Sequence, residues 1–161
     1  MTGRRPPIPV AWRVRPRPCS DAAVRSAVRA ALAEGRREDI EVGVVLVSDP
    51  ELAELHGRWL GDPSPTDVIA FDLDDGLGGP SGEVWVSVDR ARAVAAERRV
   101  DVASELLLYD VHGTLHLCGH DDLEPAAKRR MRAAEARALD RLGSSEIPRT
   151  TRPRRKRRLP S

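Results

Sequence analysis

Residues 102–122 read VASELLLYDVHGTLHLCGHDD, and this stretch indicates the centre of the fold. Residues 102–118 are apolar on nearly every side of a helix, a pattern typical of a central helix buried by its neighbours. His112 and His116 are four residues apart, so both imidazoles project from one face of this helix, one turn apart. Two imidazoles placed in this way can reach a single ion, and the spacing therefore predicts a metal site.

A turn after this helix supplies further ligand candidates. Gly119 can end the helix, because glycine adopts the left-handed conformation at little cost, and His120, Asp121 and Asp122 follow directly. Two histidines and one carboxylate leave a fourth tetrahedral position for water, which such an open metal site activates for hydrolysis near neutral pH. The pattern therefore predicts a metal-dependent hydrolase.

Other roles for these side chains have to be weighed. A single histidine on an apolar helix is more often a core residue bonded to a carbonyl than a ligand. Here two histidines share one face and an acidic turn follows, which favours metal. Gly113 stands where H-E-x-x-H proteases carry the glutamate that activates water, so peptide hydrolysis is disfavoured. Cys118 points from another helix face than His116 and is expected to pack in the interior rather than bind metal.

Hydrophobic periodicity predicts the elements around this helix, in the order β-α-β-α-β-β-α-α-α. The order indicates an α+β single domain, in which about five helices pack on a mixed four-stranded sheet and the central buried helix carries the metal site. The last two strands, separated by a glycine-rich loop, are expected to be neighbours. The strands are expected at residues 8–14, 40–47, 67–73 and 82–88, and the other helices at residues 21–34, 48–60, 89–99 and 125–142.

Composition narrows the class of protein. A chain of 161 residues with 40% hydrophobic and 3% aromatic residues fits one domain with an aliphatic core. Cys19 and Cys118 lie too far apart to suggest a disulfide framework, which fits a reducing compartment. The start lacks the apolar stretch of a signal peptide, and no run of 18 apolar residues could span a bilayer. We therefore expect a cytoplasmic protein without a membrane partner.

The C-terminal end differs from the rest in charge. Seven Lys and Arg residues and no acidic residue lie between residues 149 and 161, although the net charge of the whole chain is only +2. We therefore expect a metal-dependent hydrolase domain at residues 1–143 and a basic, disordered tail at residues 144–161. A basic tail of this kind suits contacts with RNA phosphates, and the candidate contacts are Arg154, Arg155, Lys156, Arg157 and Arg158. The alternative is a solvated tail without a partner.

Three segments together resemble one known family. Residues 112–122 resemble the H-G-x-L-H-L-x-G-Y-D-H signature of the YbeY endoribonucleases, which are bacterial factors of ribosomal RNA maturation. Residues 65–71 (PTDVIAF) are similar to that family's P-T-D-V-L-S-F segment, and residues 82–87 (GEVWVS) resemble its G-D-I-x-I-S strand. Order and spacing agree over about residues 40–140. The long metal motif is the specific part of this resemblance, and the two shorter segments support it by their order.

The resemblance implies a zinc ion, one per chain, held beneath a central sheet whose strands 67–73 and 82–88 wall a cleft. It also implies hydrolytic cleavage of single-stranded RNA, in maturation of the 3′ end of small-subunit ribosomal RNA and in ribosome quality control. A metal-bound water would attack phosphorus while the ion stabilises charge on the phosphate oxygens. Ribosomal RNA and the ribosomal subunit are the expected partners, and a small-molecule substrate is not expected.

The chain departs from the family signature in its metal motif. Asp122 replaces the last histidine and His120 replaces the tyrosine. We therefore predict His112, His116 and Asp122 as the ligands, a set that tolerates other divalent ions better than three histidines would. His120 is a competing ligand or a catalytic proton donor.

A second departure concerns the activity. The family usually carries an Asn and then an activity-linked Arg before its P-T-D segment, and those positions hold His56 and Leu60 here. Arg58, two residues before Leu60, is the nearest arginine and therefore the catalytic candidate. Two residues on a helix correspond to a turn of about 200°, so Arg58 points to a different face than the family's Arg. The missing Arg keeps a second hypothesis open, a metal-stabilised ribosome-associated factor that binds RNA without cutting it. A third hypothesis is a metallohydrolase of another substrate.

Overall fold

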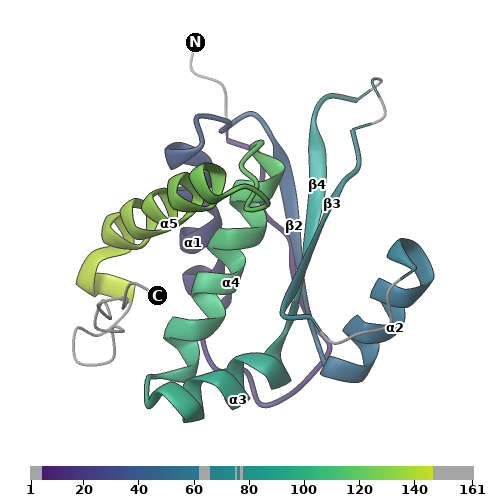
Figure 1. The fold of residues 1–161 in the computed structure, drawn as a ribbon, viewed down its shortest axis with the longest axis vertical. Helices are drawn as coiled ribbons and strands as arrows, with labels where there is room; N and C mark the ends of the chain where they lie inside the picture. The colour runs from purple at the N-terminus through teal and green to yellow at the C-terminus, as the bar shows by residue number, and fades with distance from the viewer. Residues whose placement is uncertain (1–4, 62–65, 75, 77, 147–161) are drawn as a thin grey trace.

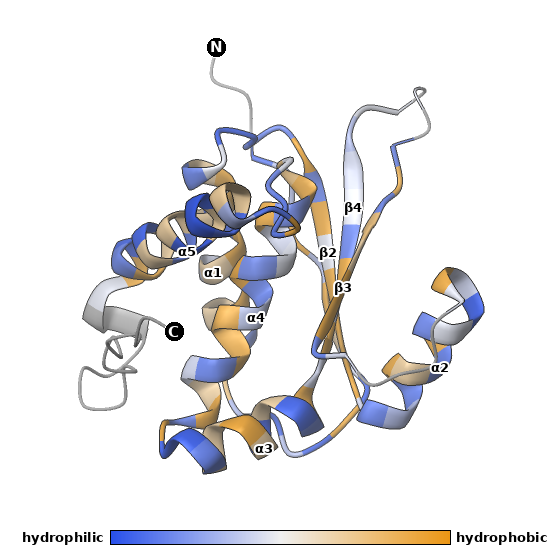
Figure 2. Cartoon of the chain, viewed as in Figure 1, coloured by the Kyte–Doolittle hydropathy of each residue, from blue (hydrophilic) through white to orange (hydrophobic). Residues whose placement is uncertain are grey.

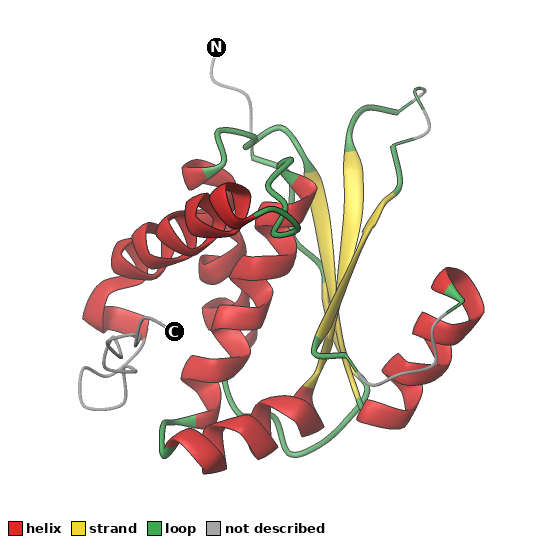
Figure 3. Cartoon of the chain, viewed as in Figure 1, coloured by secondary structure: helices red, strands yellow, loops and turns green. Residues whose placement is uncertain are grey.

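A four-stranded mixed sheet forms the centre of the computed structural model, which describes residues 5–61, 66–74, 76 and 78–146 (Figures 1 and 3). The predicted α+β class, strands and helices are confirmed, and their ends differ from the prediction by a few residues. The elements are β1 (Val10–Trp12), α1 (Asp21–Glu34), β2 (Glu41–Val47), α2 (Asp49–Leu60), β3 (Val68–Asp72), β4 (Ser81–Ser87), α3 (Val88–Arg98), α4 (Val102–Leu117) and α5 (Pro125–Glu146).

The strand order in the sheet is β1-β2-β4-β3. β1, β2 and β4 run parallel, and Val44 of β2 lies opposite Val84 of β4. β3 and β4 pair in antiparallel orientation, with Ile69 opposite Trp85, so the two strands predicted to be neighbours are neighbours. β3 is therefore an edge strand, and it pairs with a strand that continues directly into α3.

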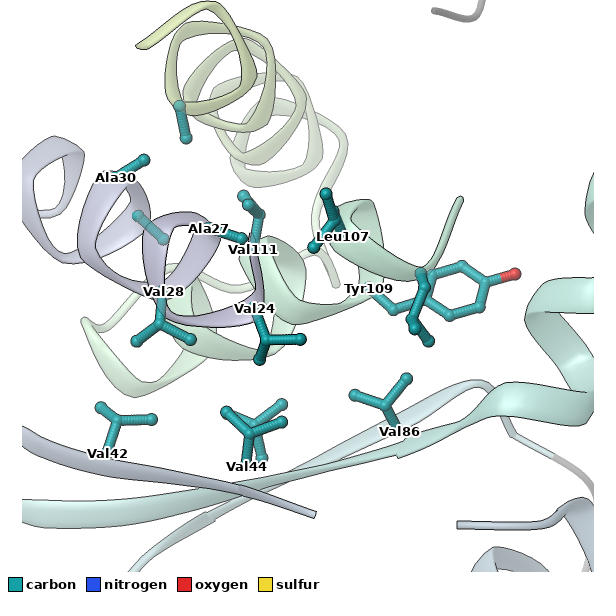
Figure 4. Close-up of a cluster of buried hydrophobic side chains, with 14 of the residues drawn as sticks. Val24, Ala27, Val28, Ala30, Val42, Val44, Val86, Leu107, Tyr109 and Val111 are labelled. Carbon is teal, nitrogen blue, oxygen red and sulfur yellow. The ribbon is translucent and has the colours of Figure 1, made fainter. Parts of the chain in front are cut away.

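The helices cover the two faces of the sheet unequally (Figure 1). α1 and α4 pack on one face with α5 outside them, α3 lies across one end, and α2 packs on the other face. The main core lies between the sheet and the first group and is aliphatic, as predicted. Polar residues gather on the outer sides of α3 and α5, whereas β2 and β3 are largely hydrophobic (Figure 2). The fully buried residues of this core shown in Figure 4 include Val24, Val28, Val86, Leu107 and Val111.

Local capping explains where several helices begin. The side chains of Ser20, Ser48 and Ser87 each accept a hydrogen bond from a backbone N–H in the first turn of α1, α2 and α3. α2 ends at Gly61, whose φ of 71° is left-handed. None of the helices in the described part of the chain is long and apolar enough to span a lipid bilayer.

The C-terminal helix contains a break at the predicted domain boundary. Gly143 has φ 61° and ψ −153°, which are not helical, and residues up to Glu146 continue α5 beyond it. Residues 147–161 lie outside the described residues, and with them the candidate RNA contacts Arg154, Arg155, Lys156, Arg157 and Arg158. The division into a domain at 1–143 and a basic tail at 144–161 thus stays a prediction.

Candidate metal centre

The structure brings together the three residues predicted as ligands. The Nε2 atoms of His112 and His116 lie 3.1 Å apart. A carboxylate oxygen of Asp122 lies 3.6 Å from Nε2 of His112, and the other lies 4.0 Å from Nε2 of His116. All three ligand atoms lie within 4.8 Å of one another, and each residue is partly exposed. The group is therefore both compact and accessible from solvent.

The spacing of these atoms fits one divalent ion. In a tetrahedral zinc site with bonds of 2.0–2.1 Å, ligand atoms lie about 3.3 Å from one another. The pairs at 3.1 and 3.6 Å are close to this spacing, and the Asp122 carboxylate would move toward His116 from its present 4.0 Å to complete the site. The two imidazole rings are nearly perpendicular, with an interplanar angle of 79°, so their nitrogen atoms approach while the ring faces do not stack. Two imidazole nitrogens and one carboxylate oxygen suit zinc and other first-row divalent ions.

The reversal of the chain after α4 places Asp122 beside the histidines. Gly119 has φ 103°, as expected for a glycine that ends a helix, and its N–H donates to the carbonyl of His116. The N–H of His120 donates to the carbonyl of Leu115 at 3.1 Å. Backbone bonds thus hold the turn against the last turn of α4, and the carboxylate two residues later reaches the imidazoles.

Gly113 lets α4 lie close to the sheet. A Cβ atom at this position would lie 2.6 Å from Cγ1 of Val84 and 2.9 Å from Cγ2 of Val68, distances that real side chains do not show. A glutamate in this place, as in the H-E-x-x-H proteases, would therefore not fit without moving α4 away from β3 and β4. Close packing of α4 on the sheet therefore explains why glycine, and not the glutamate of those proteases, occupies position 113.

Glu135 of α5 is a component of the site that the sequence analysis missed. Nδ1 of His112 donates a hydrogen bond to Oε2 of Glu135 at 2.5 Å, and the Glu135 side chain is only 16% exposed. With Nδ1 engaged, the other ring nitrogen, Nε2, faces His116 and Asp122. A carboxylate behind a histidine is the usual way to fix the tautomer and orientation of a metal ligand. The sequence gives only one hint of this role, which is that Glu135 directly follows Ala134 of the apolar stripe of the helix.

The environment gives the two histidines opposite tendencies to bind a proton. Burial disfavours the charged form of His112, but the hydrogen bond and the negative charge of Glu135 outweigh it and raise the pKa of His112. Burial and the neighbouring His112 lower the pKa of His116. The lowered pKa of His116 favours its neutral imidazole, the form that binds metal, whereas a proton at His112 competes with the metal.

His120 and Cys118 are not part of the group of three ligands. Together with Asp121 and Arg130, they line a polar hollow of about 250 Å³ on the turn. The Cys118 side chain packs against Gly35, which leaves no room there for a Cβ, and against the main core. Burial raises the pKa of its thiol to about 11. The predicted packing role of Cys118 is confirmed, and a thiol of this kind is a poor ligand and nucleophile.

The structure does not place Arg58 beside the metal centre. Arg58 is exposed on α2, which lies on the opposite side of the sheet from α4 (Figure 1). Leu60, at the position of the family's Arg, is 56% exposed on the same helix. A catalytic role of Arg58 therefore stays a prediction without geometric support.

Comparisons with known proteins agree on one family. A sequence profile of the family described as "Endoribonuclease YbeY" matches residues 16–143, which is most of the chain. A protein named "Endoribonuclease YbeY" from Anaeromyxobacter sp. (strain Fw109-5) is 41% identical over 119 residues, which cover 71% of this chain and 62% of that protein. One of the same name from Salinispora tropica is 39% identical over 132 residues, covering 73% of this chain and 84% of that protein.

A solved structure supports the fold. The solution structure of TM1509 from Thermotoga maritima superimposes with a TM-score of 0.57 and 23% sequence identity. The match covers 85% of this chain and 92% of that one. The match spans less than two thirds of the Anaeromyxobacter relative's length.

Proposed function

The chain belongs to the YbeY endoribonuclease family, and we propose that it is a metal-dependent endoribonuclease that cleaves single-stranded RNA in ribosomal RNA maturation. The observation that supports this most is the convergence of His112, His116 and Asp122, whose ligand atoms lie within 4.8 Å of one another. Processing of the 3′ end of small-subunit ribosomal RNA and ribosome quality control belong to the same proposal.

Each residue of the centre has a role in this proposal. His112, His116 and Asp122 hold one zinc ion, and Glu135 keeps Nε2 of His112 directed toward the ion. The metal, when bound, supplies an activated water and stabilises negative charge on the phosphate. His120 lies on the same turn and is the candidate proton donor. Because Asp122 is a harder ligand than the family's histidine, we expect Mn²⁺ or other divalent ions to replace zinc more readily than at three histidines.

The proposal extends to the surroundings of the enzyme. We expect it to act in the cytoplasm on the ribosomal subunit, with the basic tail (144–161) strengthening its attachment to RNA through phosphate contacts. A truncated chain that ends at residue 143 should bind RNA more weakly and with a shallower salt dependence than the full chain. Co-sedimentation with ribosomal subunits at increasing salt measures both effects.

A second function has one observation in its favour. Leu60 stands at the position of the family's activity-linked Arg, and Arg58 lies across the sheet from the metal centre. Without that Arg, the protein could be a metal-stabilised factor that binds ribosomal RNA without cutting it. In that case the ion would stabilise the fold, and its removal would lower the melting temperature without any cleavage being lost.

Metal content and RNA cleavage, measured side by side, separate the two functions. Asp122→Asn removes the charge of a proposed ligand, and Asp121→Asn makes the same change one residue away and keeps an oxygen that can accept from the N–H of Leu123. One zinc per chain by elemental analysis, with cleavage lost in Asp122→Asn and retained in Asp121→Asn, supports the nuclease. A bound metal without cleavage in the wild type supports the non-cutting factor, and a wild type without metal contradicts both.

A further inference from the structure

One edge of α5 carries two exposed cations beside the metal centre. Lys128 and Arg132 are four residues apart and Glu135 follows three residues later, so the three side chains share one edge of the helix. The hydrogen bond from His112 to Glu135 shows that the Glu135 end of this edge faces α4 and the metal ligands, and Arg132 and Lys128 lie about one and two turns before it. Lys128 and Arg132 together are called the basic edge below.

The charges of the basic edge are not neutralised by neighbours. Lys128 and Arg132 are both exposed, and within the described part of the chain neither forms an ion pair. The carboxylates of the centre, on Asp122 and Glu135, contact His112. The basic edge therefore presents free positive charge next to the ligand group.

The other cations of α5 point elsewhere. Arg137 and Arg141 donate hydrogen bonds to Glu34 at the end of α1, at 2.5 and 3.2 Å, on the side of α5 away from Glu135. Arg130 lines the hollow beside His120, and Arg129 is turned about 100° from Lys128 around the helix axis. Only two of the six cations of this helix therefore share an edge with Glu135, the residue that contacts His112.

We propose that Lys128 and Arg132 bind phosphates of the RNA strand next to the phosphodiester held at the metal centre. This inference rests on the proposed RNA substrate and identifies where the strand leaves the site. A flexible lysine acts as a point charge and an arginine as a two-pronged donor, and both are common partners of phosphate oxygens. α5 contains no aromatic residue on which a base could stack. The contact is therefore to the backbone of the strand and independent of base sequence.

Two double variants that each remove two positive charges from α5 test where the phosphate contacts lie. Lys128→Gln with Arg132→Gln removes the basic edge, whereas Arg129→Gln with Arg130→Gln removes two cations from other sides of the same helix. Binding of a fluorescently labelled single-stranded RNA is followed by anisotropy over a range of salt concentrations. A non-cleavable RNA analogue is used so that the metal-loaded protein does not cut it, and circular dichroism confirms that each variant is folded.

The salt dependence provides the expected result. Each phosphate contact to a single strand contributes about 0.7 to the slope of log affinity against log salt. Loss of the basic edge should therefore make the slope shallower by about 1.4 and weaken binding at low salt, while the Arg129/Arg130 variant stays closer to wild type.

Three further outcomes are informative. Equal slopes in the two double variants would overturn the assignment of the basic edge. A wild-type protein that does not bind RNA would overturn it as well, together with the proposed function. If the predicted difference in slope appears but the metal-loaded protein does not cleave unmodified RNA, the basic edge stands and the nuclease function fails.

Discussion

Oε2 of Glu135 lies 2.5 Å from Nδ1 of His112, a contact between two helices made by residues 23 positions apart. Removing this carboxylate should leave His112 free to rotate and to change tautomer, which weakens the metal site without removing a ligand. We expect Glu135→Ala to lower zinc affinity about 10- to 100-fold and Glu135→Gln to lower it less, because an amide oxygen can still accept the hydrogen bond. Competition with a fluorescent chelator measures this affinity.

The matched control for this prediction is Glu124→Gln, an exposed glutamate just before α5. It should leave zinc affinity unchanged. A Glu135→Ala protein that is folded and binds zinc as tightly as wild type would show that the hydrogen bond has no role in metal binding.

A methyl group at Gly113 should separate α4 from the sheet. Its Cβ would meet Val84 at 2.6 Å and Val68 at 2.9 Å, so Gly113→Ala should lower the free energy of unfolding by about 1–3 kcal/mol. Gly78→Ala is the control, because a Cβ there meets nothing within 4 Å. Chemical denaturation measures both. If steric overlap is the cause, Val84→Ala should restore part of the loss in the double variant, and a purely additive double variant would argue against it.

The ion pairs of Glu34 should make stability depend on pH. The hydrogen bond from Arg137, opposed in part by burial and supported by Arg141, lowers the pKa of Glu34. A lowered pKa in the fold means that the stabilisation is present above the unfolded pKa of about 4.3 and is lost as the pH falls through the folded value. Glu34→Gln should therefore destabilise by about 1 kcal/mol at pH 7 and by almost nothing near pH 3.

Thermal unfolding of wild type and Glu34→Gln across this pH range tests the prediction. Glu97→Gln, an exposed glutamate on α3, serves as the control for the loss of one negative charge. A Glu34→Gln effect that is the same at pH 3 and pH 7 would contradict the assignment to these ion pairs.

Asp110 should weaken the fold rather than stabilise it. Its side chain is fully buried in α4, and neither carboxylate oxygen has a hydrogen-bond partner in the described structure. Burial raises the pKa of Asp110 well above its usual value, since the charged form is disfavoured in the core. Replacing it by an apolar residue, Asp110→Val, should raise the free energy of unfolding by about 1–3 kcal/mol in urea denaturation. A destabilised variant would indicate that the carboxylate has a partner.

Much of the fold could be predicted because its signals are local. Ser20 and Ser48 precede helices that begin where these caps predict, and the alternation from apolar strand to amphipathic helix follows from a few adjacent residues. The ligands His112, His116 and Asp122 could be predicted for the same reason, since one helix turn and one loop bring them together.

Contacts between distant segments could not be predicted in this way. The pairing of Glu135 with His112 depends on how α5 crosses α4, and no periodicity encodes that angle. The parallel pairing of β2 with β4 could not be predicted either, because α2 and β3 lie between these strands in the sequence. This pairing places Val44 opposite Val84. Only the neighbouring position of β3 and β4 could be expected, because a short glycine-rich loop joins them.

The weak attachment of α2 has a consequence for how the molecule opens. Leu52 is the one buried residue of this helix, and with Val47 and Ile69 it forms a small cluster separated from the main core by the sheet. Such a helix can detach while the larger core stays closed, so it forms its own cooperative unit. Amide protons of α2 should exchange through this local opening, whereas those of α4 should exchange only when the whole domain unfolds.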